Sequence, residues 1–132
     1  GNTKAAVELL AQKLRGKGEH VVTYDLARCD MAAAVADAFR YDRLVLATTT
    51  YNGDVFPFMK EFINHLTERN YQNRTVAFME NGSWAPVAAR VMAKMLENSK
   101  NLTYAENDVK LFSALSAESE KQIELLAEEL CR

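Results

Sequence analysis

The chain has 132 residues, enough for one folded domain around a single hydrophobic core. Hydrophobic residues make up 48% and charged residues 26%, with only 5 Gly and 2 Pro, which excludes disordered, collagen-like and low-complexity proteins. The formal net charge of -2 arises from interleaved acids and bases, so the sequence offers no basic surface for nucleic acid. We expect one globular domain over residues 1–132.

Membrane and metal chemistry are also disfavoured by the sequence. The longest apolar runs, such as residues 44–47, are far too short to span a bilayer, and no charged-then-apolar signal segment opens the chain. Cys29 and Cys131 lie about a hundred residues apart, and neither a CxxC nor an HxxxH spacing occurs. His20 and His65 are expected to be solvated or hydrogen-bonded rather than catalytic. We expect a cytoplasmic protein with no membrane contact and no metal site.

The first half of the chain predicts two helices and two strands. In residues 2–15, apolar residues recur every three or four positions, which predicts an amphipathic helix. Residues 20–26 are rich in β-branched and aromatic types and predict a strand. Asp30 is placed to cap a second helix that runs through Phe39. Residues 43–49 are almost continuously apolar, which is typical of a parallel strand buried on both faces.

The middle of the chain continues the alternation. Residues 50–54 form a polar, glycine-containing loop, and Pro57 suits the first turn of a third helix. Residues 74–79 predict the next strand, which leads into a polar loop at residues 80–86. Both loops therefore follow directly after predicted strands.

The last part of the chain predicts two helices and one weak strand. A fourth helix is expected to begin near Ser83 or Trp84. Residues 102–112 carry a strand signal that three polar residues weaken, so we expect a short or interrupted strand. Ser116 can cap a final helix.

Alternating helices and strands at this spacing predict βαβ units, and hence a doubly wound parallel sheet with helices on both faces. The sequence contains no internal repeat, linker or second domain. Such a domain normally opens with a strand, whereas this chain opens with a predicted helix. The chain therefore begins one element later than expected.

Ligands of open α/β sheets bind at the carboxyl ends of the strands. Three polar segments are expected there: residues 1–3, 48–54 and 80–86. The start of the first helix can hold a phosphate through its free N–H groups and partial positive charge, with Asn2 and Thr3 as additional side-chain donors. A phosphate site without Lys or Arg is compatible with the weakly acidic composition.

Each of the two long loops carries one aromatic residue, Tyr51 and Trp84. Two aromatic rings can enclose a flat heteroaromatic ligand, while the Asn and Gly residues beside them offer backbone donors and acceptors. The residue types alone leave an alternative open. Residues 1–3 are then only a helix cap, and both loops are only turns between strands and helices.

The three segments resemble motifs of one family. Residues 1–3, GNT, are similar to the tail of the phosphate motif of flavodoxins. Residues 48–57, TTTYNGDVFP, resemble a loop of the A-type flavoproteins, the flavo-diiron family, and residues 80–86, ENGSWAP, resemble a third loop of clostridial-type members. The motifs occur in order and the similarity spans the chain. It implies a flavodoxin-like fold, a doubly wound parallel sheet in a three-layer α/β/α arrangement.

The resemblance also implies FMN as the cofactor. It assigns the phosphate to the first helix and the isoalloxazine ring to the two loops. It further implies that the Gly53 peptide tunes the flavin potentials. The positions that match the family's phosphate, first ring loop and second ring loop are, in that order, Gly1, Asn2 and Thr3; Thr49, Thr50, Tyr51, Asn52 and Gly53; and Asn81, Gly82, Ser83 and Trp84.

Two departures from the family pattern are expected to matter. The first strand and the front of the phosphate loop are absent from this chain, and so is the diiron domain that reduces oxygen or nitric oxide. We therefore expect weak FMN binding. The absent strand would lie between residues 20–26 and 43–49, so these strands must pair with each other or with a second chain, and we expect a homodimer.

Three hypotheses for the function follow. The first is an FMN-binding electron-transfer domain whose partners are a rubredoxin or a reductase and a diiron domain. The second is a flavodoxin-like scaffold without flavin that serves as an interaction module or is a truncated product. The third, a phosphoacceptor receiver domain, is disfavoured because Thr48 and Thr49 stand where it needs an aspartate.

Overall fold

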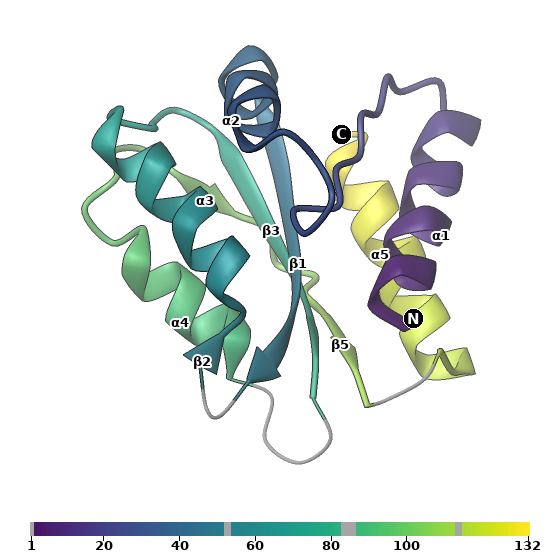
Figure 1. Cartoon of the computed structure of the whole chain (residues 1–132). Coiled ribbons are helices and arrows are strands. Elements are labelled where there is room, and N and C mark those ends of the chain that lie inside the picture. The colour runs from purple at the N-terminus through teal and green to yellow at the C-terminus, as the bar shows by residue number, and fades with distance from the viewer. Residues whose placement is uncertain (1, 52–53, 83–86, 113–114) are drawn as a thin grey trace.

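The structure is a computed structural model that describes residues 2–51, 54–82, 87–112 and 115–132. The described residues form helices on both sides of a central sheet, which gives three layers (Figure 1). The helices are α1 (Asn2–Gly16), α2 (Met31–Arg40), α3 (Pro57–Glu68), α4 (Ala88–Met95) and α5 (Ala117–Leu130). The strands are β1 (Arg43–Tyr51), β2 (Asp54–Val55), β3 (Thr75–Asn81), β4 (Thr103–Tyr104) and β5 (Val109–Leu111).

The sheet is built around β1 and β3, which run parallel. Their register extends from Arg43 opposite Thr75 to Thr49 opposite Asn81. On its other edge, β3 pairs in parallel first with β4 and then with β5. The short β2 runs antiparallel to the end of β1. The strand order is therefore β2-β1-β3-β4, with β5 also beside β3.

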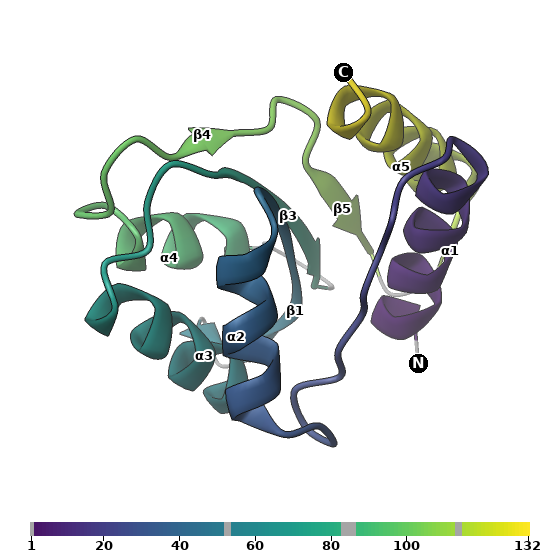
Figure 2. The ribbon, with the colours of Figure 1, turned by 90° about the horizontal axis from the view of Figure 1, so that it is seen from above.

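Each face of the sheet carries its own hydrophobic core. Helices α2, α3 and α4 cover one face, and α1 and α5 cover the other, as Figures 1 and 2 both show. Along β3, Val76 and Phe78 face the first core, whereas Ala77 and Met79 face the second. The alternation follows from the period of two in a strand. A strand that is covered on both faces is apolar on both faces, which explains the apolar residues at 76–79.

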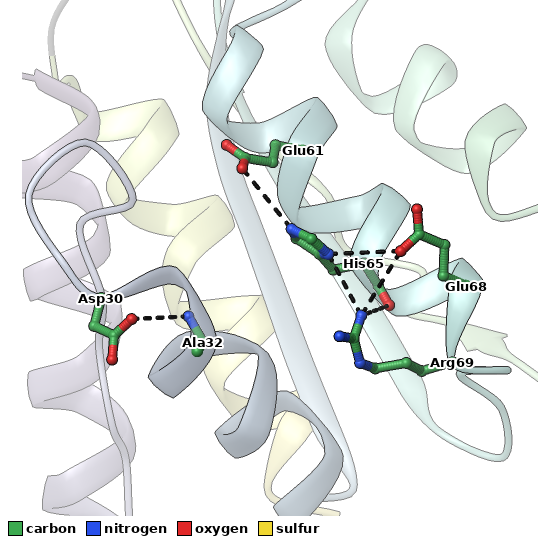
Figure 3. Close-up of polar contacts among 6 residues, drawn as sticks. All are labelled: Asp30, Ala32, Glu61, His65, Glu68 and Arg69. Carbon is green, nitrogen blue, oxygen red and sulfur yellow. Dashed lines mark hydrogen bonds and ion pairs between the residues drawn. The ribbon is translucent and has the colours of Figure 1, made fainter.

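The helix starts confirm the capping signals in the sequence. The Asp30 side chain accepts a hydrogen bond from the backbone N–H of Ala32, as Figure 3 shows. Ser116 and Ser119 form a reciprocal capping box at the start of α5. Pro57 is the first residue of α3. Each device satisfies or avoids a backbone N–H that has no partner inside the helix.

His65 lies on the surface of α3 among charged neighbours (Figure 3). Its Nε2 is 3.8 Å from a carboxylate oxygen of Glu61, and its Nδ1 is 3.6 Å from one of Glu68. Arg69 donates to the backbone carbonyl of His65 at 3.2 Å. Arg69 also lies within hydrogen-bond distance of the imidazole, 3.4 Å from its Nδ1, which confirms the prediction of a hydrogen-bonded His65.

The prediction of a strand at residues 20–26 is wrong. The segment is extended and held by side chains: Arg15 donates to the carbonyl of Val21, and the Tyr24 hydroxyl bonds the Asp37 carboxylate. Among the described residues, no strand pairs with its backbone. Within the described ranges, the outer edge of β1 is paired only at its end, by β2. The two segments therefore do not pair with each other, and strand-forming residue types without a neighbouring strand leave an extended chain.

Smaller differences concern element ends. The strand predicted at 43–49 continues to Tyr51, and the predicted loop at 50–54 contributes Asp54 to β2. Helix α4 begins at Ala88, and the predicted start at Ser83 or Trp84 lies outside the described residues. The strand predicted at 102–112 is interrupted as expected, as β4 and β5.

The end of the chain is fastened to the start of β1. The Arg43 guanidinium donates to the carbonyl of Leu130 and, at 2.8 Å, to that of Arg132. The start of β1 and the end of α5 therefore lie together, opposite the carboxyl end of the sheet (Figure 1). Within the described ranges, no helix is long and apolar enough to cross a membrane.

Candidate functional site at the carboxyl end of the sheet

The carboxyl ends of β1 and β3 meet at one edge of the sheet because the two strands are parallel and in register. Thr49 and Asn81 are the last paired residues of this ladder. Helix α1 starts at the same end of the molecule (Figure 1). Its buried residues Ala6 and Leu10 pack on the sheet in the second core. This packing fixes the amino end of α1 beside the strand ends.

A side-chain contact joins the helix start to the strand end. The Asn81 Nδ2 donates a hydrogen bond to the Thr3 Oγ1 at 3.4 Å. Both residues are half-buried, whereas Asn2 is exposed. The first turn of α1 contains no acidic side chain. The amino end of α1 thus presents partial positive charge and a threonine hydroxyl, an arrangement suited to an anion.

The second predicted loop begins at a fixed strand end. The backbone N–H of Gly82 donates to the carbonyl of Leu111 at 3.1 Å, which ties the end of β3 to β5. Asn81 and Gly82 are therefore anchored between two neighbouring strands. The register brings Thr49 of the first predicted ring loop side by side with Asn81 of the second.

The remaining predicted site residues fall into two groups. The structure places the backbone of Thr50 and Tyr51 in β1, where they pair with Val55 and Asp54. The other predicted site residues lie outside the described ranges, namely Gly1, Asn52, Gly53, Ser83 and Trp84. Their assignment rests on the sequence resemblance.

Glu80 is the feature that the sequence analysis missed. It was placed at the start of a polar loop, but it belongs to β3 and is only 2% exposed. Burial raises the pKa of its carboxyl, while Lys110 and the backbone N–H groups of Ala89 and Ala88 act to lower it. The alternation along β3 puts Glu80 on the same face as Phe78, but nothing local in the sequence shows that other elements cover this glutamate. Within the described ranges, no group of three acidic, histidine or cysteine side chains could hold a metal ion.

Comparison of the fold with solved structures identifies its architecture. The rubredoxin:oxygen oxidoreductase of Desulfovibrio gigas superposes with a TM-score of 0.91 at 16% identity, over 99% of this chain and 32% of that one. The flavodiiron protein of Giardia intestinalis gives a TM-score of 0.86 at 14% identity, over 98% of this chain and 32% of that one. This chain thus spans about a third of the length of both proteins.

A flavodoxin of similar length also matches. The flavodoxin of Streptococcus pneumoniae TIGR4 gives a TM-score of 0.83 at 23% identity, over 99% of this chain and 90% of that one. A comparison with curated protein sequences found no match. The fold is therefore the flavodoxin-like parallel α/β arrangement predicted from the sequence.

A family model settles the membership that these structural likenesses leave open. The model for the flavodoxin domain matches residues 1–122, which is most of the chain. The carboxyl end of the sheet, where α1, β1 and β3 meet, lies within the matched region. The chain belongs to the flavodoxin domain family.

Proposed function

We propose that this domain binds FMN at the carboxyl end of its sheet and carries electrons between redox partners. The observation that supports this most is the contact between Asn81 and Thr3, which couples the amino end of α1 to the end of β3. FMN would supply the redox chemistry through its isoalloxazine ring, which takes up and releases electrons. A cytoplasmic location is part of the proposal and rests on the composition.

The phosphate would be held by the amino end of α1. The Thr3 hydroxyl and the N–H groups of the first helical turn donate hydrogen bonds without contributing a formal charge. The Asn81 amide holds the Thr3 side chain in place from the neighbouring strand. No acid or base is required of these residues, because their part is to bind and orient the cofactor.

The ring would lie against the strand ends. Thr49 and Gly82 would border it with backbone groups, and the sequence resemblance adds Thr50, Tyr51, Asn52, Gly53, Ser83 and Trp84. Aromatic residues beside the ring would exclude water from it. By excluding water and fixing backbone dipoles near the ring, the domain would set the reduction potential of the flavin.

The redox partners are proposed from the family. A rubredoxin or a reductase would donate electrons, and a diiron domain would accept them. Because the chain spans only about a third of the matched oxidoreductase and flavodiiron protein, reduction of oxygen or nitric oxide belongs to the proposal for a larger assembly. The domain itself would carry the flavin step.

An FMN titration followed by flavin fluorescence quenching tests the proposal. We expect saturable quenching, and we expect Thr3→Val to raise the Kd about tenfold or more, because a hydrogen bond to a charged group is worth about 1.5–3 kcal/mol. Thr67→Val is the matched control: its hydroxyl bonds the Asn64 carbonyl on the surface of α3. It should leave the Kd unchanged.

Two results would contradict the proposal. Equal Kd values for Thr3→Val and the unchanged protein would show that the start of α1 does not bind the phosphate. An absence of quenching at millimolar FMN would favour the second candidate, a scaffold that serves as an interaction module. The outer edge of β1 before Thr50, which pairs with no strand among the described residues, is the observation that supports that second candidate, since such edges accept strands from other chains.

A further inference from the structure

A cavity of about 370 Å³ lies between α4 and the sheet. Its lining includes Phe78 and Glu80 from β3, Arg90 from α4, and Tyr104, Asp108 and Lys110 from the β4–β5 region. Because α4 and α1 cover opposite faces of the sheet, this cavity is separate from the amino end of α1. Its volume is at the lower end of the range for small-molecule sites.

One polar atom in this cavity lacks a partner. The Glu80 side chain is 98% buried, and among the described residues its Oε1 has no hydrogen-bond partner. The backbone N–H groups of Ala89 and Ala88 favour the charged carboxylate, so part of its demand is met from α4. A buried oxygen without a donor is costly and uncommon in folded proteins. A donor supplied from within the cavity would remove that cost.

The charges around the cavity balance one another. Glu80 and Asp108 are opposed by Lys110 and Arg90, which also line it. The positive charge of Lys110 acts on both carboxyl groups, although burial raises the pKa of each. Within the described ranges, no ion pair closer than 4 Å joins Lys110 to either acid. A balanced set of charges gives little attraction for a free ion and favours a neutral ligand.

The cavity also has a flat wall. The rings of Phe78 and Tyr104 stack with centroids 5.6 Å apart and an interplanar angle of 22°. Tyr104 is 39% exposed, so part of its ring is available to a ligand. Aromatic faces of this kind bind flat rings by offset stacking. The wall therefore favours a planar ligand over an aliphatic one.

We propose that this cavity binds a neutral planar heterocycle that carries an amino group. The amino group donates to the Oε1 of Glu80, and the ring lies against Tyr104. Asp108 and Lys110 offer an acceptor and a donor to the polar edge of the ring. The site is distinct from the proposed FMN site, because Phe78 and α4, which form much of its lining, lie on the face of the sheet opposite α1.

The test uses adenine as the probe and purine, which lacks the amino group, as its matched partner. Each is titrated into the ¹⁵N-labelled chain, and backbone amide shifts are followed by NMR. We expect adenine to shift the amides of Tyr104, Ala105 and Lys110, and purine to bind about tenfold more weakly, as the loss of one hydrogen bond predicts. The cation benzamidine should bind no better than purine.

Two variants locate the site. Glu80→Leu removes the acceptor and should raise the Kd for adenine about tenfold or more. Tyr104→Ala removes the exposed wall and should raise it similarly; because the ring is partly exposed, this variant keeps the test decisive if Glu80→Leu fails to fold. Phe112→Ala, another exposed aromatic residue but not a lining one, is the control and should leave the Kd unchanged.

Any of four results overturns the proposal. They are no shift of the lining amides at about 5 mM adenine, a concentration at which millimolar binding would be evident; equal affinity for purine; stronger binding of benzamidine; or an unchanged Kd in Tyr104→Ala. A cavity that holds only water gives the first result. Failure of FMN to bind leaves all four readouts intact, so the two proposals are tested separately.

Discussion

Tyr71 is fully buried yet carries a polar atom that is not satisfied. Among the described residues, its hydroxyl has no hydrogen-bond partner. Its ring meets that of Phe39 edge-on at 5.2 Å, and the Arg74 guanidinium lies 4.9 Å from its centroid. Burial raises the pKa of Tyr71 to about 12, although Arg74 acts to lower it. The packing of the Tyr71 ring therefore stabilises the fold, whereas its buried hydroxyl contributes no hydrogen bond among the described residues.

Removing that hydroxyl should leave the protein as stable or more stable. Tyr71→Phe keeps the ring and removes a buried group without a partner, so we expect a gain of up to about 1 kcal/mol at pH 7. The folded pKa of about 12 exceeds the unfolded value near 10, so stability is full below pH 10 and is lost as the pH rises towards 12. The advantage of Tyr71→Phe should therefore grow above pH 10.

Urea unfolding at pH 7 and at pH 11 measures both effects. Tyr104→Phe is the control at pH 7, since Tyr104 is 39% exposed and its hydroxyl is not among the buried atoms without a partner in the described chain. A loss of more than about 1 kcal/mol at pH 7 in Tyr71→Phe would mean that the hydroxyl has a partner after all.

At the scale of elements, Glu129 holds the connection between β4 and β5 against α5. Its carboxylate accepts hydrogen bonds from the backbone N–H groups of Glu106 and Asn107 and from the Asn107 amide, at 2.8–3.0 Å. Burial acts to raise the pKa of Glu129, but these hydrogen bonds outweigh it, and the pKa is lowered. A single side chain from α5 thus binds the residues that connect the two short strands.

Glu129→Gln should destabilise the protein at neutral pH. The amide has one acceptor oxygen in place of two, and it lacks the charge that strengthens the hydrogen bonds. A lowered folded-state pKa gives stability that is present above the unfolded value, about 4.3, and is lost as the pH falls through the folded value. The difference between the two proteins should therefore be largest near pH 7 and vanish in acid.

Chemical unfolding from pH 7 to pH 3 follows this difference. Glu128→Gln, one residue earlier on the exposed side of α5, removes the same charge without the contacts and should have little effect. An equal effect of the two substitutions would show that net charge, not the contact with residues 106 and 107, sets the stability.

Local sequence signals predicted helices well, because a helix satisfies its own backbone hydrogen bonds. Asp30, Pro57 and Ser116 accordingly marked real helix starts. Residues 20–26 failed because a strand needs the edge of another strand, which residue types alone do not guarantee. The interruption between β4 and β5 was predictable from the polar residues at 106–108.

At the scale of the whole molecule, the sheet has an open side. In the described chain, no strand pairs with the outer edge of β1 before Thr50 or with residues 20–24. The Val22 side chain in that second segment is 41% exposed. β1 is only partly buried, whereas β3 is buried along its length. Unpaired strand edges with apolar side chains favour association.

We therefore expect this chain to dimerise through the open side. Sedimentation velocity should show a concentration-dependent dimer, because the edge groups gain partners from the second copy. Val22→Lys places a charge at this edge and should shift the equilibrium to the monomer. Leu125→Lys, equally exposed at 41% but on α5, is the control. A monomer at about 100 µM, a concentration at which even micromolar association would be evident, contradicts this prediction.

The candidate site was predictable in outline because strand order places carboxyl ends together. Thr49 and Asn81 end two neighbouring parallel strands, and Thr3 starts the helix that contacts Asn81. In a parallel α/β sheet, strand ends and helix starts lie at the same edge. Glu80 was not predictable as a buried group, because its burial depends on α4 and β5 covering it from elsewhere in the sequence. Long-range covering of a polar residue leaves no local pattern.

The bond from Arg43 to the final carbonyls determines how this domain can be attached to a surface. The last residues are fastened where β1 begins, and the candidate flavin site lies where β1 ends. A linker joined to Arg132 would leave the molecule at the pole away from that site (Figure 1). An electrode or bead coupled through the last residue would thus leave the candidate site facing outward, whereas coupling through the first residue would place that site against the surface.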